Sequence, residues 1–301
     1  MDRTIRPVER RGSIGDVMEP VVTVEQMRAS LSAVVAGPSV VVADVRWYLD
    51  GRSGRAAFEA GHIPGAVFVD LDNDLSGHGQ SPTAGRHPFP TPIAFARAMS
   101  QLGIGDDTPV IAYDDSGGGT AGRLVWMLRV LGHDAALLDG GLQAWTGDLE
   151  QGAGAAPKPG PATFTVRPWP ADRFAAADDT AALARADDAV VLDARAADRY
   201  RGETEPIDAR AGHIPGAANA PWAGNLESTH GRFRAPAELA AHYAQAGARR
   251  GSTVVCYCGS GVSACANLLG LERAGIDGAR LYVASWSGWS SDPEREVATG
   301  A

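Results

Sequence analysis

The chain carries three cysteines, Cys256, Cys258 and Cys265, within ten residues of one another. An odd and tightly clustered set is a poor disulfide framework. It is also a poor metal site, because neither a Cys-x-x-Cys pair nor a nearby histidine supplies the remaining ligands. Two interpretations are left: a reactive thiol in a reducing compartment, or three small, buried hydrophobic side chains.

The local sequence favours a reactive thiol at Cys258. An apolar strand runs into this cysteine, and a helix is expected to begin just after the following loop. That loop consists of Gly259, Ser260, Gly261, Val262 and Ser263. Its glycines let successive backbone N–H groups turn toward one point, and the helix N-terminus adds partial positive charge there. Such donors favour a thiolate and would also stabilise an anionic persulfide. Cys256, one pleat deeper, and Cys265, in the first helical turn, are expected to be structural.

The chain repeats itself once. The hexapeptide GHIPGA occurs at residues 61–66 and again at 212–217. Each copy follows an apolar run that ends in Asp-x-Arg, at Arg46 and Arg195. Each is followed by a second apolar run and then by a short strand and a tryptophan, in the same order. Four ordered features recurring at offsets of 144 to 151 residues indicate a duplicated domain.

The elements that must position these residues alternate between short β-branched runs and helical stretches. In the second half, strands are expected at residues 188–194, 252–258 and 279–284, and helices at 236–247 and 263–275, with Gly247 and Gly275 at helix ends. Continuous apolar strands between helices indicate a parallel sheet covered on both faces, and hence two α/β domains. The predicted division is a flexible leader (1–20), a non-catalytic N-terminal domain (21–149), a linker rich in Gly, Ala and Pro (150–162) and a catalytic C-terminal domain (163–301).

The first half is expected to lack the thiol chemistry. Aligning Tyr113 with Tyr257 places Asp114 where the second half has Cys258. A carboxylate cannot carry a persulfide, so one active site per chain is predicted. The first half is expected to close the active-site cleft from the other side.

These features together make the chain resemble the tandem-domain rhodaneses over nearly its full length. The similarity lies in the duplicated Asp-x-Arg and GHIPGA elements, the cysteine heading a six-residue loop in the second half only, and the motif Ser285-Trp286-x-x-Trp289. It implies two tandem rhodanese-like domains, each a mostly parallel sheet flanked by helices, and a sulfur carried as a persulfide on Cys258. The sequence CGSGV at 258–262 is similar to the loop of 3-mercaptopyruvate sulfurtransferases. Thiosulfate sulfurtransferases typically have Cys-Arg-Lys-Gly there, where added cations suit a dianionic donor.

The resemblance also implies roles for residues outside the loop. Arg199 matches the family arginine that binds the anionic end of the donor, for which a guanidinium fork is suited. The family's second such arginine falls at Asp208 here, and Arg210, two residues on, is expected to substitute. A Ser-His-Asp relay would place Ser260 and His62 in its first two positions, although no acidic partner lies between residues 51 and 57. His62 has an alternative interpretation, as an imidazole that fixes its turn, which is the role expected of its twin His213.

Composition limits the partners. A net charge of −9 argues against a general nucleic-acid binder, but a small anionic donor is compatible if arginines gather locally. No apolar run is long enough for a membrane helix, and the charged N-terminus lacks the apolar core of a secretory signal. A cytoplasmic protein is therefore expected. The persulfide cycle that the resemblance implies needs no metal or organic cofactor.

The predicted reaction moves sulfur from 3-mercaptopyruvate to a thiol or cyanide, with ping-pong kinetics. Thiosulfate as the donor is the nearest alternative. A Cys-dependent phosphatase is disfavoured because the position six residues after Cys258, where such enzymes have an arginine, is Ala264. A non-catalytic rhodanese-like binding module is disfavoured because the loop cysteine is present.

Overall fold

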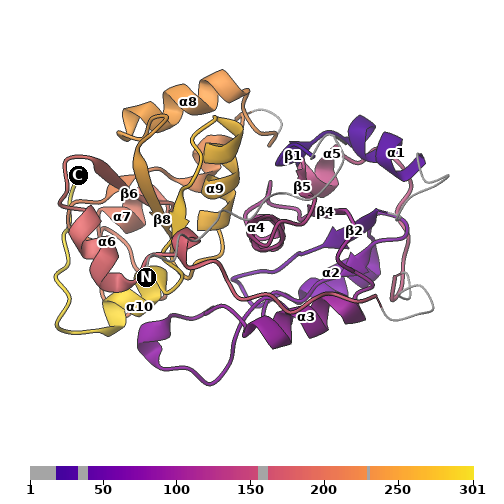
Figure 1. The fold of residues 1–301 in the computed structure, drawn as a ribbon, viewed down its shortest axis with the longest axis horizontal. Helices are drawn as coiled ribbons and strands as arrows, with labels where there is room; N and C mark the ends of the chain where they lie inside the picture. Colours follow the sequence, from indigo (N-terminus) through magenta and orange to yellow (C-terminus); the bar gives the residue numbers. More distant parts are fainter. Residues whose placement is uncertain (1–17, 33–39, 155–161, 229–230) are drawn as a thin grey trace, which may run out of the picture.

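The computed structural model describes residues 18–32, 40–154, 162–228 and 231–301. The predicted leader at 1–20 therefore lies outside the described residues except for its last three, and residues 155–161 of the predicted linker lie outside them as well. Each half of the chain forms its own sheet, and the two halves lie side by side (Figure 1). Within the described ranges, no helix is long and apolar enough to cross a membrane.

The N-terminal half is built on a five-stranded sheet in the order β1-β5-β4-β2-β3, with every neighbouring pair parallel. Its strands are β1 (Val21–Val22), β2 (Val41–Asp44), β3 (Val67–Phe68), β4 (Val110–Tyr113) and β5 (Ala135–Leu138). Its helices are α1 (Val24–Ser32), α2 (Gly54–Ala60), α3 (Pro92–Gln101), α4 (Ala121–Val130) and α5 (Gly141–Ala144), with the 3₁₀ turn η1 (Pro82–Ala84). All four residues of β4 are buried, as expected for a central strand covered by helices on both faces.

The C-terminal half repeats this plan with a four-stranded parallel sheet in the order β7-β6-β8-β9. Its strands are β6 (Ala189–Asp193), β7 (Ala218–Asn219), β8 (Thr253–Tyr257) and β9 (Arg280–Leu281). Its helices are α6 (Ala177–Leu183), α7 (Ala197–Tyr200), α8 (Pro236–Gln245), α9 (Ala264–Arg273) and α10 (Ser285–Ser291), with the 3₁₀ turns η2 (Ala171–Arg173) and η3 (Trp222–Asn225).

The predicted elements of this half are confirmed, with one difference at the last strand. Strands β6 and β8 and helices α8 and α9 lie within the predicted ranges. Gly247 and Gly275 follow the helix ends with φ of +90° and +74°, a conformation that costs glycine little. The strand expected at 279–284 pairs over Arg280–Leu281 alone, because the chain then turns into α10.

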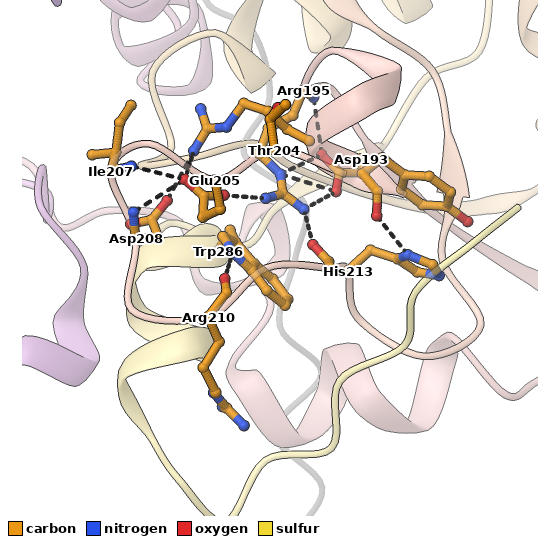
Figure 2. A network of polar contacts seen from close by, with 12 residues as sticks. Asp193, Arg195, Thr204, Glu205, Ile207, Asp208, Arg210, His213 and Trp286 are labelled. Carbon is orange, nitrogen blue, oxygen red and sulfur yellow. Dashed lines mark hydrogen bonds and ion pairs between the residues drawn. The ribbon is translucent and has the colours of Figure 1, made fainter. Parts of the chain in front are cut away.

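The repeated motifs make the same contacts in both halves. In the C-terminal half, the Asp193 carboxylate pairs with the Arg195 guanidinium at 2.7 Å, and Arg195 Nη2 donates to the carbonyl oxygen of Gly212 at 2.6 Å (Figure 2). Both charged groups are buried. The Asp-x-Arg motif therefore ties the end of a strand to the start of GHIPGA. The N-terminal half repeats these contacts with Asp44, Arg46 and Gly61.

The two halves meet along helices that follow equivalent loops. Helix α4 packs against α9 (Figure 1), and a Cβ atom on Gly122 would lie 3.1 Å from the backbone nitrogen of Ala266. The absence of a side chain at Gly122 thus lets the two helices approach closely. Beside them, η1 reaches across from the N-terminal half and contacts α10. The N-terminal half therefore faces the loop that begins at Cys258.

Candidate active site

Cys258 follows the last residue of β8 and is buried, with 2% of its surface exposed. Its backbone N–H donates to Ser285 Oγ at 3.1 Å, and its carbonyl oxygen accepts from the N–H of Trp286 at 2.9 Å. Ser285 has φ of +53°, and no other non-glycine residue in the described parts of the chain has a positive φ. Such a conformation is strained and persists where surrounding contacts impose it. The start of α10 thus anchors the base of the cysteine loop.

The backbone of the loop lies so close to neighbouring groups that its two glycine positions leave little room for a side chain. Gly261 has φ of +76°, and a Cβ atom there would lie 2.4 Å from the carbonyl oxygen of Val283. At Gly259 a Cβ atom would instead meet two guanidinium groups, Arg86 Nη2 at 3.1 Å and Arg199 Nη1 at 3.6 Å. Val262 is buried, and Ser263 is the N-cap residue of α9. The loop is therefore closed on one side by backbone and open on the other toward two cations.

The equivalent loop of the N-terminal half shows how such a loop holds an anion. Asp114 occupies the position after Tyr113 at the end of β4, as Cys258 does after β8, and it is 1% exposed. Its carboxylate accepts backbone N–H groups at 2.8–2.9 Å from Ser116, Gly118, Thr120 and Ala121. Four inward-pointing amides around one negative charge are the arrangement predicted for the cysteine loop.

Ser260 belongs to a hydrogen-bonded chain that crosses between the halves. Its Oγ lies 2.8 Å from His87 Nδ1, and His87 Nε2 lies 3.2 Å from Asp72 Oδ1. Trp47 Nε1 also donates to Asp72, at 3.0 Å. In the tautomer that donates Nε2–H to Asp72, Nδ1 accepts the Ser260 hydroxyl proton. Burial lowers the pKa of His87 to about 4, and the positive charge of Arg123 adds to this effect, so the ring is neutral at pH 7.

The histidine beside Ser260 is therefore His87, and the expectation that His62 fills this position is corrected. His62 is fully buried against the N-terminal sheet, where its Nδ1 lies 2.9 Å from the carbonyl oxygen of Phe58 and its ring stacks on the Phe58 ring. His213 makes the same two contacts with Tyr200, at 2.8 Å and with stacked rings. Both histidines fix the turn of their GHIPGA motif, which was the alternative interpretation of His62.

Arg123 is a site residue that sequence reasoning missed. It lies on α4 and is fully buried, yet no carboxylate among the described residues pairs with it. Its guanidinium donates to the carbonyl oxygens of Leu75 at 2.9 Å, His87 at 2.8 Å and Gly261 at 3.0 Å. It thereby joins the segment that carries His87 to the cysteine loop of the other half. In the sequence, Arg123 is a charged residue near the start of the otherwise mostly apolar stretch 121–130, which also contains Arg129 at its end.

Arg199 lies close to the loop, as expected, and its guanidinium is hydrogen-bonded to two carboxylates. Its Nη2 donates to Glu205 at 2.6 Å and to Asp208 at 3.1 Å. Arg195 also reaches Glu205, at 3.3 Å (Figure 2). Burial alone would raise the pKa of Glu205, but hydrogen bonds from Arg199 and from the backbone outweigh it and lower that pKa. Glu205 is therefore an anion at neutral pH that orients the arginine.

The substitution of Arg210 for the second family arginine is contradicted. Figure 2 shows its side chain extending away from Glu205 and Asp208. Its guanidinium is occupied by backbone carbonyl oxygens near the C-terminal end of α10, those of Trp289, Ser290, Asp292 and Arg295. Neighbouring positions on a turn face different directions, so closeness in sequence to Asp208 does not bring Arg210 to the loop. The second guanidinium there comes from Arg86.

Cys256 and Cys265 are fully buried and unpaired. Burial raises the pKa of Cys265 to about 12 and raises that of Cys256 as well, so both remain neutral thiols at pH 7. Cys265 Sγ lies 3.5 Å from the carbonyl oxygen of Gly261. Their surroundings are those of structural side chains.

Comparisons with known proteins agree with this arrangement. A family model described as a rhodanese-like domain matches the chain twice, over residues 27–148 and 176–292. The "Probable 3-mercaptopyruvate sulfurtransferase" of Pseudomonas aeruginosa is 43% identical over 289 residues, which cover 92% of this chain and 97% of that protein. The "Putative thiosulfate sulfurtransferase SseB" of Mycobacterium tuberculosis is 41% identical over 269 residues, which cover 88% and 93%. The crystal structure of SseA from Escherichia coli, titled as a 3-mercaptopyruvate sulfotransferase with the rhodanese fold, has a TM-score of 0.76 at 30% identity and covers 89% and 99%. The chain therefore belongs to the rhodanese-like family, with two such domains in tandem.

Proposed function

We propose that the protein is a sulfurtransferase that takes sulfur from 3-mercaptopyruvate, carries it as a persulfide on Cys258 and passes it to a thiol. The observation that carries this proposal is the convergence on one loop of a buried thiol, the chain Ser260–His87–Asp72 and the guanidinium of Arg199. Sulfur transfer is the activity named for the relatives from P. aeruginosa and M. tuberculosis.

In the first half-reaction, the Cys258 thiolate attacks the sulfur of mercaptopyruvate, and the donor's C–S bond breaks. The electron pair of that bond stays on carbon as the enolate of pyruvate, which takes up one proton. Thiol and mercaptopyruvate thus become persulfide and pyruvate, with no external oxidant. Neutral His87, acting through the Ser260 hydroxyl, is placed to move this proton. Loop amides stabilise the anionic persulfide, as the amides of the other loop hold Asp114.

In the second half-reaction, an acceptor thiolate attacks the outer sulfur of the persulfide, and Cys258 leaves as a thiolate. Cyanide would serve as an alternative acceptor. The three unpaired cysteines favour a reducing compartment, and we place the reaction in the cytoplasm. The nucleophile belongs to residues 163–301, whereas residues 21–149, which were expected to be non-catalytic, supply His87, Asp72 and Arg123 to the same site.

Mercaptopyruvate is favoured over thiosulfate by the charge around the loop. Residues 259–263 carry no cation, and the guanidinium groups of Arg86 and Arg199 are balanced by Glu205 and Asp208. A locally neutral site with well-aligned donors suits a monocarboxylate better than a dianion. The name of the M. tuberculosis relative makes thiosulfate the second candidate.

Two measurements test this proposal. Intact mass spectrometry after incubation with mercaptopyruvate should show the gain of one sulfur atom in the wild type and none in Cys258→Ser. Steady-state kcat/KM values with each donor should be larger for mercaptopyruvate. A larger value for thiosulfate would overturn the donor, and sulfur gained by the Cys258→Ser variant would overturn the persulfide.

A further inference from the structure

A pocket in the N-terminal half adjoins the residues that serve Cys258. It has a volume of about 430 Å³ and lies where β2 ends and α2 begins (Figure 1). Its lining comes from residues 46–49, 51–55, 68 and 70–72. Ligands of parallel sheets bind outside the carboxyl ends of the strands, which is where this pocket lies. A donor held by Arg199 at the cysteine loop would leave the pocket free for another ligand.

Asp72 belongs both to this pocket and to the hydrogen-bonded chain of the active site. Its carboxylate lies 3.2 Å from His87 Nε2, and His87 Nδ1 lies 2.8 Å from Ser260 Oγ in the cysteine loop. The Asp72 side chain is 50% exposed and that of His87 is 10% exposed, so solvent reaches this edge of the chain. A ligand beside Asp72 is therefore two side-chain contacts away from the loop that would carry the persulfide.

Two arginines give the pocket positive charge. The Arg55 guanidinium lies over the Phe68 ring, 4.4 Å from its centroid, and no carboxylate among the described residues pairs with it. The Arg52 guanidinium lies over the Tyr48 ring at 3.9 Å. Its Nε pairs with Asp50 at 2.8 Å, which leaves its terminal nitrogens without a partner in the described ranges. Aromatic faces thus hold both guanidinium groups at the pocket while their N–H donors stay available to an anion.

The two carboxylates that line the pocket already have donors of their own. Asp70 accepts from the backbone N–H groups of Asp72 at 3.0 Å and Asn73 at 3.1 Å, and from Asn73 Nδ2 at 3.0 Å. Asp72 accepts from Trp47 Nε1 at 3.0 Å and faces His87. Neither carboxylate neutralises Arg55. The charge of that guanidinium is therefore left for the carboxylate of a ligand.

We propose that this pocket binds the sulfur acceptor, a peptide-like thiol whose carboxylate pairs with Arg55 and Arg52 while its sulfur reaches Cys258. Each residue of an extended peptide spans about 3.5 Å, so a thiol of three or four residues covers about 10–14 Å. Free cysteine is too short to contact both places. This inference rests on the proposed function and specifies the class of thiol that accepts the sulfur.

The transfer step needs no further reactant. The acceptor thiol releases its proton to solvent, and its thiolate forms a bond to the outer sulfur of the persulfide. The S–S bond to Cys258 breaks, and its electron pair stays on Cys258 as a thiolate. The acceptor leaves as a persulfide, so no external oxidant or reductant is consumed.

A matched pair of acceptors tests the role of the carboxylate. N-acetyl-Cys-Gly-Gly-Gly with a free C-terminal carboxylate and the same peptide with a C-terminal amide differ only in that charge. With Cys258 loaded with sulfur, the second-order rate constant of transfer should be about three- to tenfold larger for the carboxylate peptide, and this advantage should shrink as ionic strength rises. Arg55→Gln should lose most of the advantage, and the double variant Arg52→Gln/Arg55→Gln should lose all of it.

Arg97→Gln is the matched control variant. Arg97 is an exposed arginine of the same half, on α3 and outside the pocket. This variant should keep the full advantage of the carboxylate peptide. N-acetylcysteine, whose carboxylate lies too close to its sulfur to reach the pocket, should react at the same rate with the wild type and with every variant.

Binding can also be followed without any persulfide. The unreactive analogue N-acetyl-Ser-Gly-Gly-Gly should shift the NMR signal of the Trp47 indole N–H in the wild type and in Arg97→Gln, because Trp47 lines the pocket. It should not do so in the double variant. A carboxylate advantage that survives in the double variant, or an unshifted Trp47 signal in the wild type, would overturn the proposal. Failure of the proposed function would look different: the wild type would form no persulfide, while the Trp47 signal would still respond to the analogue.

Discussion

Replacing Arg123 with methionine should destabilise the fold by about 2–5 kcal/mol and slow persulfide formation. The buried guanidinium donates to three carbonyl oxygens, those of Leu75, His87 and Gly261. Hydrogen bonds from a charged group contribute about 1.5–3 kcal/mol each. Burial lowers the pKa of Arg123 from 12.5 to about 10, which corresponds to about 3 kcal/mol against the charged form. The hydrogen bonds outweigh this cost, so the arginine stabilises the fold on balance.

Arg123→Met should also lower activity, because two of the carbonyl oxygens that accept from Arg123 belong to the active site. One is on His87 and another is in the cysteine loop, so the methionine variant releases both ends of the Ser260–His87 contact. A displacement of about 1 Å in a catalytic group can cost about a hundredfold in rate. We expect the single-turnover rate of persulfide formation, followed by intact mass, to fall about tenfold or more.

Arg129→Met is the matched control for Arg123→Met. Arg129 also lies on α4 and also crosses to the C-terminal half, where it pairs with Glu272 on α9. No hydrogen bond joins it to His87 or to the loop within the described residues. Urea unfolding should show a loss of stability in both variants, but only Arg123→Met should lose activity per folded molecule. Wild-type persulfide formation in Arg123→Met, or an equal loss of activity per folded molecule in the two variants, would refute the reasoning.

Two other substitutions test groups of the N-terminal half. His87→Asn should lower kcat/KM by about 10²–10⁴-fold, as expected for loss of an acid–base group. Because the folded pKa of His87, about 4, lies below its ordinary value of 6.5, the wild type gains up to about 3 kcal/mol of stability as pH rises through this window. His87→Asn lacks this gain, so its urea midpoint should rise less with pH than that of the wild type. An equal response of the two midpoints to pH would contradict a buried, neutral His87 ring. Asp114→Ala leaves four backbone N–H groups without their acceptor. The free energy of unfolding should fall by about 3–5 kcal/mol, while the variant still forms the Cys258 persulfide. An unchanged free energy of unfolding would contradict the role of the four amides in holding Asp114.

The parts of the site that follow one another along the chain were predictable from the sequence. The apolar strand before Cys258, the two glycines after it and the helix from Ala264 are local features, and β8 and α9 lie where they were expected. Arg199 was found through its motif rather than through geometry. The shortness of β9 was not predictable, because it depends on where Ser285 turns the chain into α10.

The residues that were missed come from the other half of the molecule. Arg86 and His87 lie more than 170 residues before the cysteine loop, and the contact between η1 and α10 brings them to it. The periodicity and spacing of residues within one half do not indicate which surfaces of the two halves pack against each other. Asp72 lies in an acidic segment after His62, whereas the relay expected for His62 placed its acidic partner before that histidine.

The error at His62 has a physical reason that applies to duplicated chains in general. A feature that occurs in both halves serves what both halves need, which is the fold: His62 and His213 each fix the same turn. A residue that is needed only once, at a single active site, has no counterpart of the same type in the other half. Cys258 and Asp114, which occupy equivalent positions in the two halves, already showed this pattern. His87 and Arg123 follow the same pattern. Chemistry in such a chain is therefore best sought where the two copies differ, and structure where they agree.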